Sequence, residues 1–446
     1  MISTLIFVCL FFSSFDCMAD IDDRMEIAST LTPVGSGARA IGMGGAFIAM
    51  ADDATSASWN PGGLIQLILP EASMVYSSFW RNEKLTFKNS PESNSNNGIH
   101  DNNLNYASVT YPFQFMDYNH IFSLTYQHLY DFNREWQYVK VEKGDHQSIT
   151  NRHFWQTGGL SAIGLSYCTQ ILRNLSLGIT LNIWDDNLSH NRWEQQELNT
   201  GIHDEPGQIN KTYTKYNKIE KYSIDGLNSN IGFLWKLSDT FRIGAVYKTA
   251  FTADVTYERL ILNAVNENAT LYIEPERFEQ MTFPESYGVG CVYKSPSGQL
   301  FIALDLFRTN WRNYTYTTYE GIEISALTGK TVNQTNIPPI NHFRAGLEYR
   351  FVYPNKQLIK TKPDKCYILP FRCGIFNVLE PAENTNDHFW GISLGTGITL
   401  IDNFSFDLAY QYRFGKNVHQ YMLKHEKFSQ DINEHMIYCS FIKYHY

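Results

Sequence analysis

Residues 403–414 read NFSFDLAYQYRF, a stretch in which almost every second side chain is apolar. Successive side chains of a β-strand point to opposite faces, so this period of two predicts a strand rather than a helix. One face carries Phe404, Phe406, Leu408, Tyr410 and Tyr412, and the other carries Ser405, Asp407, Ala409, Gln411 and Arg413. The stretch therefore predicts a strand with one apolar face and one mostly polar face.

The same alternation runs through most of the chain and predicts an all-β protein. Residues 300–306, 342–351 and 390–400 each place apolar side chains at every second position, and 390–400 has small residues on its other face. We predict about fourteen strands. They lie near residues 71–81, 104–112, 119–130, 156–170, 174–185, 226–237, 240–250, 284–294, 299–309, 341–352, 366–376, 388–400, 403–414 and 435–446.

The connections between these strands alternate in length. The short ones are 113–118, 171–173, 238–239, 295–298 and 401–402, with 353–365 as an exception, and the long ones are 82–103, 131–155, 186–225, 251–283, 310–340, 377–387 and 415–434. Tight turns at one end and long loops at the other are typical of outer-membrane barrels, whose closure pairs every backbone group in lipid. The pattern predicts a transmembrane antiparallel β-barrel of about 14 strands. A soluble β-protein is the alternative, because alternation alone does not distinguish the two.

Composition agrees with a barrel and argues against several functions. Of 446 residues, 15% are aromatic and 18% are charged, and the formal net charge is −9, which is unfavourable for binding a nucleic acid. No run of about 20 apolar residues predicts a membrane-spanning helix. The sequence contains no HExxH or phosphate-binding loop, and its GxSxG match at 391–395 falls within the alternating stretch 390–400, so we predict no enzyme activity and no cofactor.

The N-terminus resembles a secretory signal. The apolar run 5–12 is followed by Cys17-Met18-Ala19, so we predict a signal peptide over residues 1–19, with Cys17 as a lipid-modified residue the alternative. Of the remaining cysteines, Cys366 and Cys373 are candidates for a pair, although the wide scatter of all five favours free thiols.

Residues 35–64, GSGARAIGMGGAFIAMADDATSASWNPGGL, do not look like a strand. Their glycines, among them Gly44 and Gly45, suit a compact coil that passes close to other backbone. Asp52 or Asp53 is expected to cap a short helix over 54–59, which Asn60-Pro61 ends. We therefore predict an N-terminal hatch, or plug, over residues 20–70, followed by a barrel over residues 71–446.

The hatch stretch resembles that of the FadL/OmpP1/TodX family of outer-membrane transporters for long-chain fatty acids and other hydrophobic compounds. The segments FPESYGVG at 283–290, RAGLEY at 344–349 and DLAY at 407–410 are similar to the family's strands. The resemblance implies a fourteen-stranded barrel, a hatch inside its lumen and an Asn-Pro-Ala motif facing a kinked wall strand with a lateral opening. Here the motif reads Asn60-Pro61-Gly62. A PorV-like barrel that serves protein secretion is the near relative.

The polar strand faces supply charged residues to the predicted lumen. Arg344, Glu348, Arg350 and Arg413 are our candidate ligand-binding residues, because a cation there can hold a fatty carboxylate. Pairing among these charges is the competing interpretation. Arg39 is expected to anchor the hatch to a wall carboxylate. The adjacent Asp52 and Asp53 lack the spaced oxygen ligands that calcium needs, so we predict no metal site.

We therefore expect passive uptake of a long-chain fatty acid, hydrocarbon or other hydrophobic small molecule through the outer membrane of a Gram-negative-type bacterium. The gate residues would be Arg39, Gly44, Gly45, Asn60, Pro61 and Gly62. Expected partners are outer-membrane lipid and, because strand 435–446 ends on an aromatic residue, the barrel assembly machinery. The alternatives are a barrel that binds secreted protein cargo and a surface-exposed structural barrel.

Overall fold

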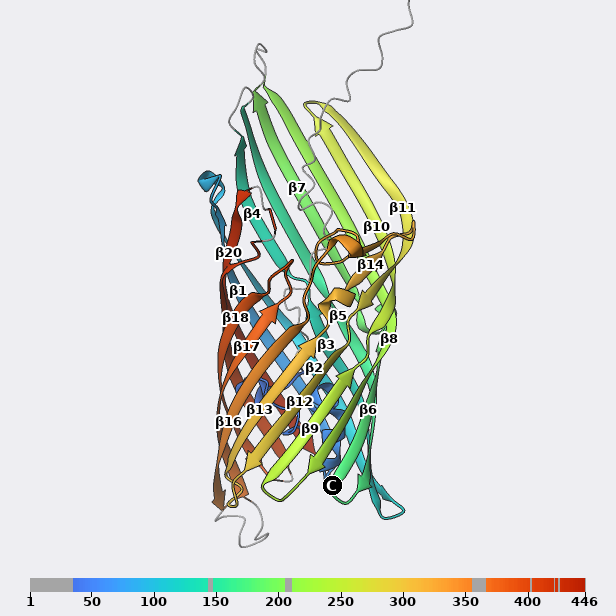
Figure 1. Ribbon diagram of the computed structural model, residues 1–446, viewed down its shortest axis with the longest axis vertical. Helices are drawn as coiled ribbons and strands as arrows, with labels where there is room; N and C mark the ends of the chain where they lie inside the picture. The colour runs from blue at the N-terminus through green and yellow to red at the C-terminus, as the bar shows by residue number, and fades with distance from the viewer. Residues whose placement is uncertain are drawn as a thin grey trace, which may run out of the picture.

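The structure is a computed structural model, and it describes residues 35–142, 147–204, 211–354, 366–401, 403–420, 422–423 and 426–445. Within these ranges fourteen antiparallel strands form a closed ring, as predicted, because the first strand pairs with the last (Figure 1). The ring strands are β1 (Glu71–Phe87), β2 (Ser95–Phe115), β3 (Tyr118–Asp131), β5 (Gln147–Leu172), β6 (Leu175–Trp184), β8 (Thr212–Lys236), β9 (Phe241–Lys248), β12 (Ser286–Lys294), β13 (Leu300–Thr309), β16 (Ile340–Pro354), β17 (Cys366–Glu380), β18 (Asp387–Leu400), β19 (Phe404–Val418) and β20 (Phe428–Tyr444).

The side-chain alternation has the direction expected of a membrane barrel. In β19 the apolar Phe406 and Leu408 are about 40% exposed on the outside, whereas Asp407 and Arg413 are buried inside. The same holds for Leu304 on the outside and Asp305 on the inside of β13. The fold is therefore a transmembrane β-barrel with an apolar outer face and a polar lumen. In the described part of the chain, no helix has the length and hydropathy to cross a membrane.

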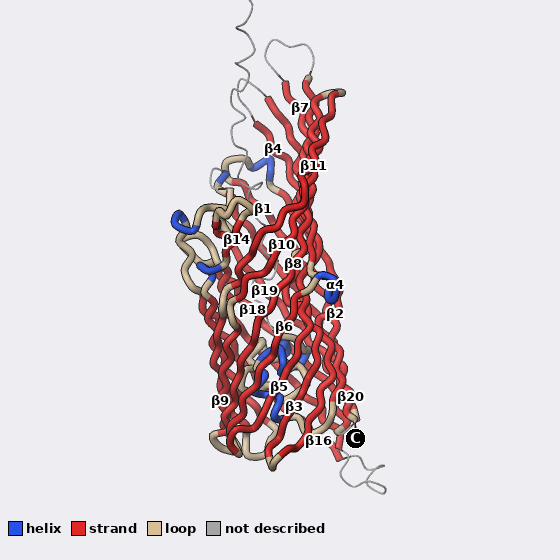
Figure 2. The backbone as a smooth tube through the Cα atoms, turned by 90° about the vertical axis from the view of Figure 1, so that its right-hand side faces the viewer, coloured by secondary structure: helices blue, strands red, loops and turns tan. Residues whose placement is uncertain are grey.

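Four of the segments predicted to be long loops contain further strands, so those predictions are wrong; 310–340 contains two short strands, and the other three contain longer ones. β4 (Arg134–Glu142), β7 (Arg192–Asp204), β10 (Phe251–Val265) and β11 (Asn268–Phe283) lie within 131–155, 186–225 and 251–283. With the long β5 and β8 they form a sheet that extends beyond the rest of the barrel (Figures 1 and 2). Strands outside a membrane need no apolar outer face, so the membrane-type pattern does not mark them.

The remaining elements are short. They are the helices α2 (Ala38–Gly42), α3 (Ser56–Trp59) and α4 (Asp186–Ser189), the 3₁₀ turns η1 (Pro61–Gln66), η2 (Pro91–Ser93), η3 (Trp311–Asn313) and η4 (Val332–Gln334), and the strands β14 (Thr315–Thr317) and β15 (Glu323–Ser325). The residues between β13 and β16 fold into the barrel mouth, where Trp311 and Leu327 join an aromatic cluster with Trp193, Tyr222 and Phe283. We call these buried side chains the mouth cluster.

The structure bears on the predicted cysteine pair but not on the predicted signal peptide. The predicted signal peptide, residues 1–19, lies outside the described residues. Cys366 and Cys373 both lie in β17, so their Cα atoms are separated by about 23 Å at roughly 3.3 Å per residue. A disulfide needs Cα atoms within about 7 Å, so these two cysteines do not pair, and Cys373 is a free thiol.

Candidate functional site: the inner segment and the lumen

Residues 35–70, which we call the inner segment, lie inside the barrel and cross it from wall to wall. α2 packs against β17–β20, and η1 packs against β5, β6, β8 and β9 on another part of the wall. Figure 2 shows these short helices within the lower part of the barrel. Apolar side chains of the segment, including Phe47, Met50 and Trp59, are buried. The segment therefore occupies the lumen as a packed body.

The turn at Met43–Gly45 shows why the sequence uses glycine here. Gly44 and Gly45 have φ angles of 68° and 75°, a left-handed conformation that glycine adopts without steric cost. The Gly44 amide donates to Ser393 Oγ at 2.8 Å, and that hydroxyl donates to the Gly42 carbonyl at 3.0 Å. These bonds fix the turn against the small-residue face of β18.

Glycines of the wall admit the inner segment, and they are functional residues that sequence reasoning missed. A Cβ added at Gly374 or Gly346 would lie less than 3.0 Å from backbone atoms of Met43. The same holds for Gly178 against the Pro61 backbone, and a Cβ at Gly232 would lie less than 3.0 Å from Asn60 Oδ1 and from Pro61 Cδ. The available signal was the presence of glycine at lumen-facing positions of otherwise apolar-alternating strands, where glycine weakens a strand unless another backbone approaches.

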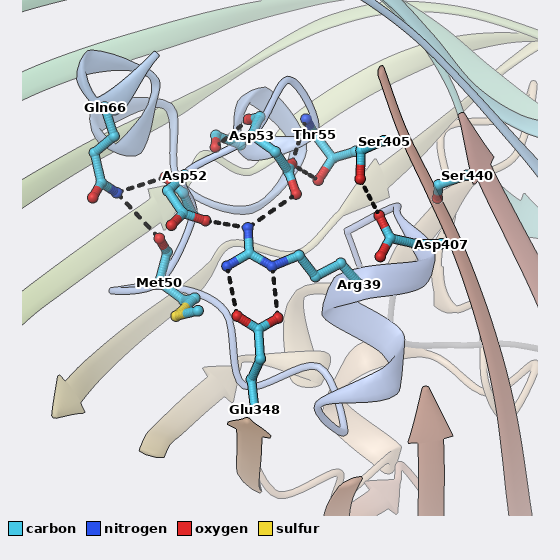
Figure 3. A network of polar contacts seen from close by, with 12 residues as sticks. Arg39, Met50, Asp52, Asp53, Thr55, Gln66, Glu348, Ser405, Asp407 and Ser440 are labelled. Carbon is cyan, nitrogen blue, oxygen red and sulfur yellow. Dashed lines mark hydrogen bonds and ion pairs between the residues drawn. The ribbon is translucent and has the colours of Figure 1, made fainter. Parts of the chain in front are cut away.

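Arg39 joins the inner segment to the wall, as predicted for an anchor (Figure 3). Its guanidinium donates to Glu348 of β16 through Nε at 2.9 Å and Nη2 at 3.3 Å. It also donates to Asp52 and lies 3.7 Å from Asp53 Oδ2. One buried cation thus bridges three carboxylates from two separate parts of the chain.

The two aspartates respond to this cation in opposite directions. Burial alone would raise the pKa of Asp52, but Arg39, with Arg350 adding a smaller effect, holds that pKa below its ordinary value. Burial raises the pKa of Asp53 despite the more distant Arg39 and its hydrogen bonds from Thr55. Asp52 is therefore the charge partner of Arg39, and Asp53 is the less compensated carboxyl group.

The helix that these aspartates were expected to cap is shorter than predicted. α3 starts at Ser56 with Thr55 in the N-cap position, and no side chain in the described ranges caps it. Asp53 Oδ1 instead accepts from the Thr55 amide at 2.9 Å and from the Thr55 hydroxyl at 2.6 Å. Asp53 therefore forms an Asx turn that satisfies the Thr55 amide just before the helix. Asp52 pairs with Arg39 instead of capping the helix.

Asn60, Pro61 and Gly62 lie against the wall at β6 and β8. The Asn60 amide group donates to the Ile48 carbonyl at 2.8 Å and to the Phe233 carbonyl of β8 at 3.0 Å. The Gly62 carbonyl accepts from Ser176 Oγ of β6 at 2.7 Å. A Cβ at Gly62 would lie 2.7 Å from the Gly232 carbonyl oxygen, which explains glycine here in place of alanine.

Three of the four predicted ligand-binding residues are engaged with other charges. Glu348 accepts from Arg39, from Arg350 Nε at 2.6 Å and from Arg372 Nε at 2.5 Å. Arg413 donates to Glu380 and, at 2.9 Å, to Glu434. These side chains brace the wall and the inner segment, which is the competing interpretation given above for lumen charges.

Arg344 differs from those three, because it forms no ion pair with another described residue. It lines a cavity between the inner segment and the mouth cluster, with a volume of about 50 Å³. Its aromatic lining consists of Tyr130, Trp184, Phe251, Phe283, Phe307 and Trp311. Lys248, at the end of β9, also lines it and was missed by the sequence analysis. Neither Lys248 nor Arg344 forms an ion pair or hydrogen bond with another described residue. We call this space the cationic cavity.

A second cavity adjoins the first and shares Leu129 and Arg344 with it. Its volume is about 100 Å³. Its lining is apolar in part, with Ile41, Phe79, Phe376, Val378 and Met436, and its polar lining includes Glu380, Gln411 and Arg413. Four further polar residues, Asn103, Asn105, His128 and Asp131, come from β2 and β3. This second space, the side cavity, therefore reaches the wall between those two strands.

The wall pairing between β2 and β3 is incomplete beside the side cavity. It runs from Phe115 opposite Tyr118 to Tyr106 opposite Gln127 and ends there. Beyond that point the described residues of β2 pair with β1, whereas β3 and β4 pair with β5. Side chains bridge the seam, since Asn105 Nδ2 donates to the His128 carbonyl at 3.5 Å and Asn97 Oδ1 accepts from the Gln137 amide at 3.0 Å.

The position of this seam differs from the expectation for the Asn60-Pro61-Gly62 motif. That motif faces β6 and β8, whose pairing is continuous from Leu175–Trp235 to Trp184–Gly226. The side cavity instead touches the inner segment at Ile41, Gly44 and Gly45. The turn at Gly44, rather than the Asn60 motif, lies beside the interrupted part of the wall.

Comparison of the sequence with family models and with curated proteins gives no match. Solved structures match along nearly the whole chain. The P. putida toluene transporter TodX shares 12% identity over 93% of this chain and 99% of that chain, with a TM-score of 0.56. A Pseudomonas aeruginosa FadL homologue shares 10% over 92% and 99%, with a TM-score of 0.54. The CymD monoaromatic hydrocarbon channel shares 13% over 93% and 98%, with a TM-score of 0.53.

These comparisons establish the fold class of the protein. The chain is a transmembrane barrel with its N-terminal part packed in the lumen. More particularly, it has the fold of the FadL homologue and the TodX and CymD hydrocarbon channels, as the family resemblance predicted. At these identities the likeness concerns the fold alone.

Proposed function

We propose that the protein passes small hydrophobic molecules inward across the outer membrane of a Gram-negative-type bacterium, with the inner segment acting as its hatch. Three structural neighbours are described as a toluene transporter, a FadL homologue and a monoaromatic hydrocarbon channel. The apolar outer face suits a membrane, and the partly apolar linings of the two cavities suit an apolar ligand, although both cavities must widen to admit one.

One observation carries the proposed route. The cationic cavity and the side cavity adjoin at Leu129 and Arg344, and the side cavity ends where the pairing of β2 and β3 stops. A ligand that leaves through this seam enters the bilayer sideways and avoids water. Movement of the inner segment around Gly44 and Gly45, which line the side cavity, would widen this route.

For the ligand itself we propose a long-chain fatty acid or another apolar carboxylate. Lys248 and Arg344 form no ion pair within 4.0 Å among the described residues, although Asp305 lies opposite Arg344 on β13, and both cations lie in an aromatic-lined cavity. A carboxylate would form charge-assisted hydrogen bonds with them. Burial of its apolar part supplies affinity at about 0.8 kcal/mol per methylene.

The test compares a charged and an uncharged ligand. We expect the double variant Lys248→Met with Arg344→Met to lose about tenfold or more of labelled-oleate uptake while retaining toluene uptake. Lys236→Met with Arg192→Met is the control, since both side chains are more than half exposed outside the lumen. If the double variant takes up both oleate and toluene like the native protein, the carboxylate assignment is wrong. If the native protein takes up neither compound, the transport proposal is wrong.

A barrel that binds secreted protein cargo is the second candidate, and the extended sheet favours it. β11 pairs with β10 over 268–279, and its exposed side chains there include Leu271 and Ile273. An exposed strand edge with apolar side chains can add a strand from another protein. The test is affinity capture with the native protein and with a variant that lacks residues 259–274, the tip of the β10–β11 hairpin. Cargo that binds only the native protein would support this function.

A further inference from the structure

A third cavity lies on the extended sheet, on the outer side of the mouth cluster. It is bounded by β7, β8, β10 and β11 and by residues 316–329, and its volume is about 380 Å³. This size is near the lower end of the range of about 300–1,000 Å³ for small-molecule sites. Its lining is largely polar, with tyrosines between charged side chains. We call it the outer cavity.

The charges of the outer cavity compensate one another. Glu220 accepts from Gln195 Nε2 at 2.6 Å, from Tyr257 at 2.7 Å and from Arg259 Nε at 3.1 Å. Arg277 lies 2.9 Å from a Glu274 oxygen and 4.3 Å from the centre of the Tyr319 ring. Because both arginines already have carboxylate partners, the cavity offers no free cation to an anion. Ionised groups also make it costly to fill with a hydrocarbon.

Gln195 borders this cavity and positions one of its carboxylates. Its side chain is 5% exposed, and its Nε2 donates to Glu220. Its Oε1 is enclosed by protein atoms and has no hydrogen-bond partner among the described residues, so a ligand in the cavity does not reach this oxygen. Gln195 therefore acts on a ligand through Glu220.

We propose that the outer cavity binds a neutral, hydroxyl-rich molecule, that is, a sugar or a sugar head group. Adjacent hydroxyls act both as donors and as acceptors, so they match carboxylates that lie beside guanidinium groups. Tyrosine rings supply apolar surface for the C–H faces of a sugar while keeping a polar end. The inference does not depend on transport of a hydrophobic compound.

The position of the cavity allows two sources of such a ligand. Tyr222, Tyr257 and Tyr316 line the outer cavity and also belong to the mouth cluster. A free sugar would fill only the polar space. The head group of a glycolipid would bind there with its apolar tail against the mouth cluster, and would therefore bind more tightly than the free sugar.

The experiment measures binding to the full-length purified protein in a detergent without a sugar head group, such as lauryldimethylamine oxide. The probes are three free sugars, glucose, galactose and maltose, and octyl glucoside below its critical micelle concentration. Calorimetry measures the binding of each probe. The test variants are Gln195→Leu and Arg277→Met. The matched control is Gln196→Leu, because Gln196 is the next residue of β7, on its opposite face, and donates instead to Asn217 Oδ1.

We expect saturable binding of at least one probe, weakened about 3–10-fold by Gln195→Leu and by Arg277→Met and unchanged by Gln196→Leu. Tighter binding of octyl glucoside than of glucose would identify a glycolipid head group, and equal binding would identify a free sugar. Absence of saturable binding by every probe would overturn the proposal. So would equal binding by the native protein and by both test variants, provided that these variants keep the heat-modifiable mobility of a folded barrel.

Discussion

At the scale of single residues, the lumen is organised by Arg39. A buried guanidinium that serves Glu348, Asp52 and Asp53 is stabilising only while its carboxylates remain, because an unpaired buried charge costs several kcal/mol. The two aspartates are adjacent in sequence, yet their pKa values shift in opposite directions. Distance from the guanidinium, rather than residue type, decides which carboxyl group stabilises the inner segment.

The variants Asp52→Asn and Asp53→Asn should therefore act with opposite signs at pH 7. Asp52 has a lowered pKa, so its contribution is present above the ordinary value near 3.8 and is lost as the pH falls through the native value. Asp52→Asn should cost about 1.5–3 kcal/mol, the scale of a hydrogen bond to a charged group. Asp53 has a raised pKa, so its ionised form costs stability at pH 7 and Asp53→Asn should remove that cost.

Hydrogen exchange of residues 35–66 at pH 7 and pH 3 measures this difference. Protection should fall in Asp52→Asn and rise in Asp53→Asn at pH 7, and both differences should shrink at pH 3. Equal loss of protection in the two variants at pH 7 would mean that the aspartates act together and that the assignment of one charge partner is wrong.

At the scale of elements, the inner segment stays in place through close backbone contact as well as through ion pairs. Gly374 of β17 and Gly346 of β16 face the Met43–Gly45 turn, and Gly178 and Gly232 face Pro61. Side chains at these positions would separate the two backbones. The wall strands thus lose some strand propensity at their glycines, and the contact with the inner segment offsets this loss.

Gly374→Ala should displace the inner segment while leaving the barrel closed. The added Cβ would lie less than 3.0 Å from the backbone of Met43 and Gly44, so overpacking should cost about 1–3 kcal/mol. The control is Gly98→Ala, whose nearest atom is a side-chain oxygen of Asn82 at 3.2 Å. Proteolysis of purified barrels should cut the inner segment in Gly374→Ala only. Full protection in Gly374→Ala would show that the wall can move aside.

The seam between β2 and β3 gives a second test at this scale. In a background without other cysteines, Asn105→Cys with His128→Cys, joined by a short thiol cross-linker, should close the seam and reduce oleate uptake at least about fivefold. Ser108→Cys with Thr125→Cys joins residues that are already backbone partners and should have no effect. Unchanged uptake in the first cross-linked pair would argue for an exit along the barrel axis.

At the scale of the whole molecule, the barrel has two parts with different surroundings. The ring of fourteen strands carries outward apolar side chains such as Val289, Leu304 and Leu394. The sheet of β7, β10 and β11 with the outer ends of β5 and β8 rises beyond it (Figure 1). The ring should therefore lie in the membrane, and the extension should stand in water.

Lysine substitutions can separate these surroundings. Leu304→Lys places a charge on the lipid-facing side of β13 and should cost about 2–4 kcal/mol of stability in a bilayer. Leu271→Lys changes a side chain of similar exposure in β11 and should cost almost nothing. Folding yield into lipid vesicles, read by heat-modifiable mobility, measures both. Equal losses would place the extension at the membrane as well.

The sequence by itself determined the strands of the ring, their number and the direction of their faces, because alternation with period two is a local property of a membrane-facing strand. It also indicated Arg39 as a candidate anchor and placed Gly44 and Gly45 in a compact coil, since a lone cation and clustered glycines are visible in one short stretch. The added strands β4, β7, β10 and β11 were not visible, because strands in water do not need the membrane pattern.

Only the tertiary structure decided which lumen charges are satisfied. Glu348, Arg350 and Arg413 look like Arg344 in sequence, but barrel closure brings Arg39, Arg372, Glu380 and Glu434 to the first three and leaves Arg344 beside Lys248 in a cavity. The place where the β2–β3 pairing stops is likewise set by neighbours distant in the chain. Pairing of charges and strands depends on three-dimensional neighbours, which local periodicity does not contain.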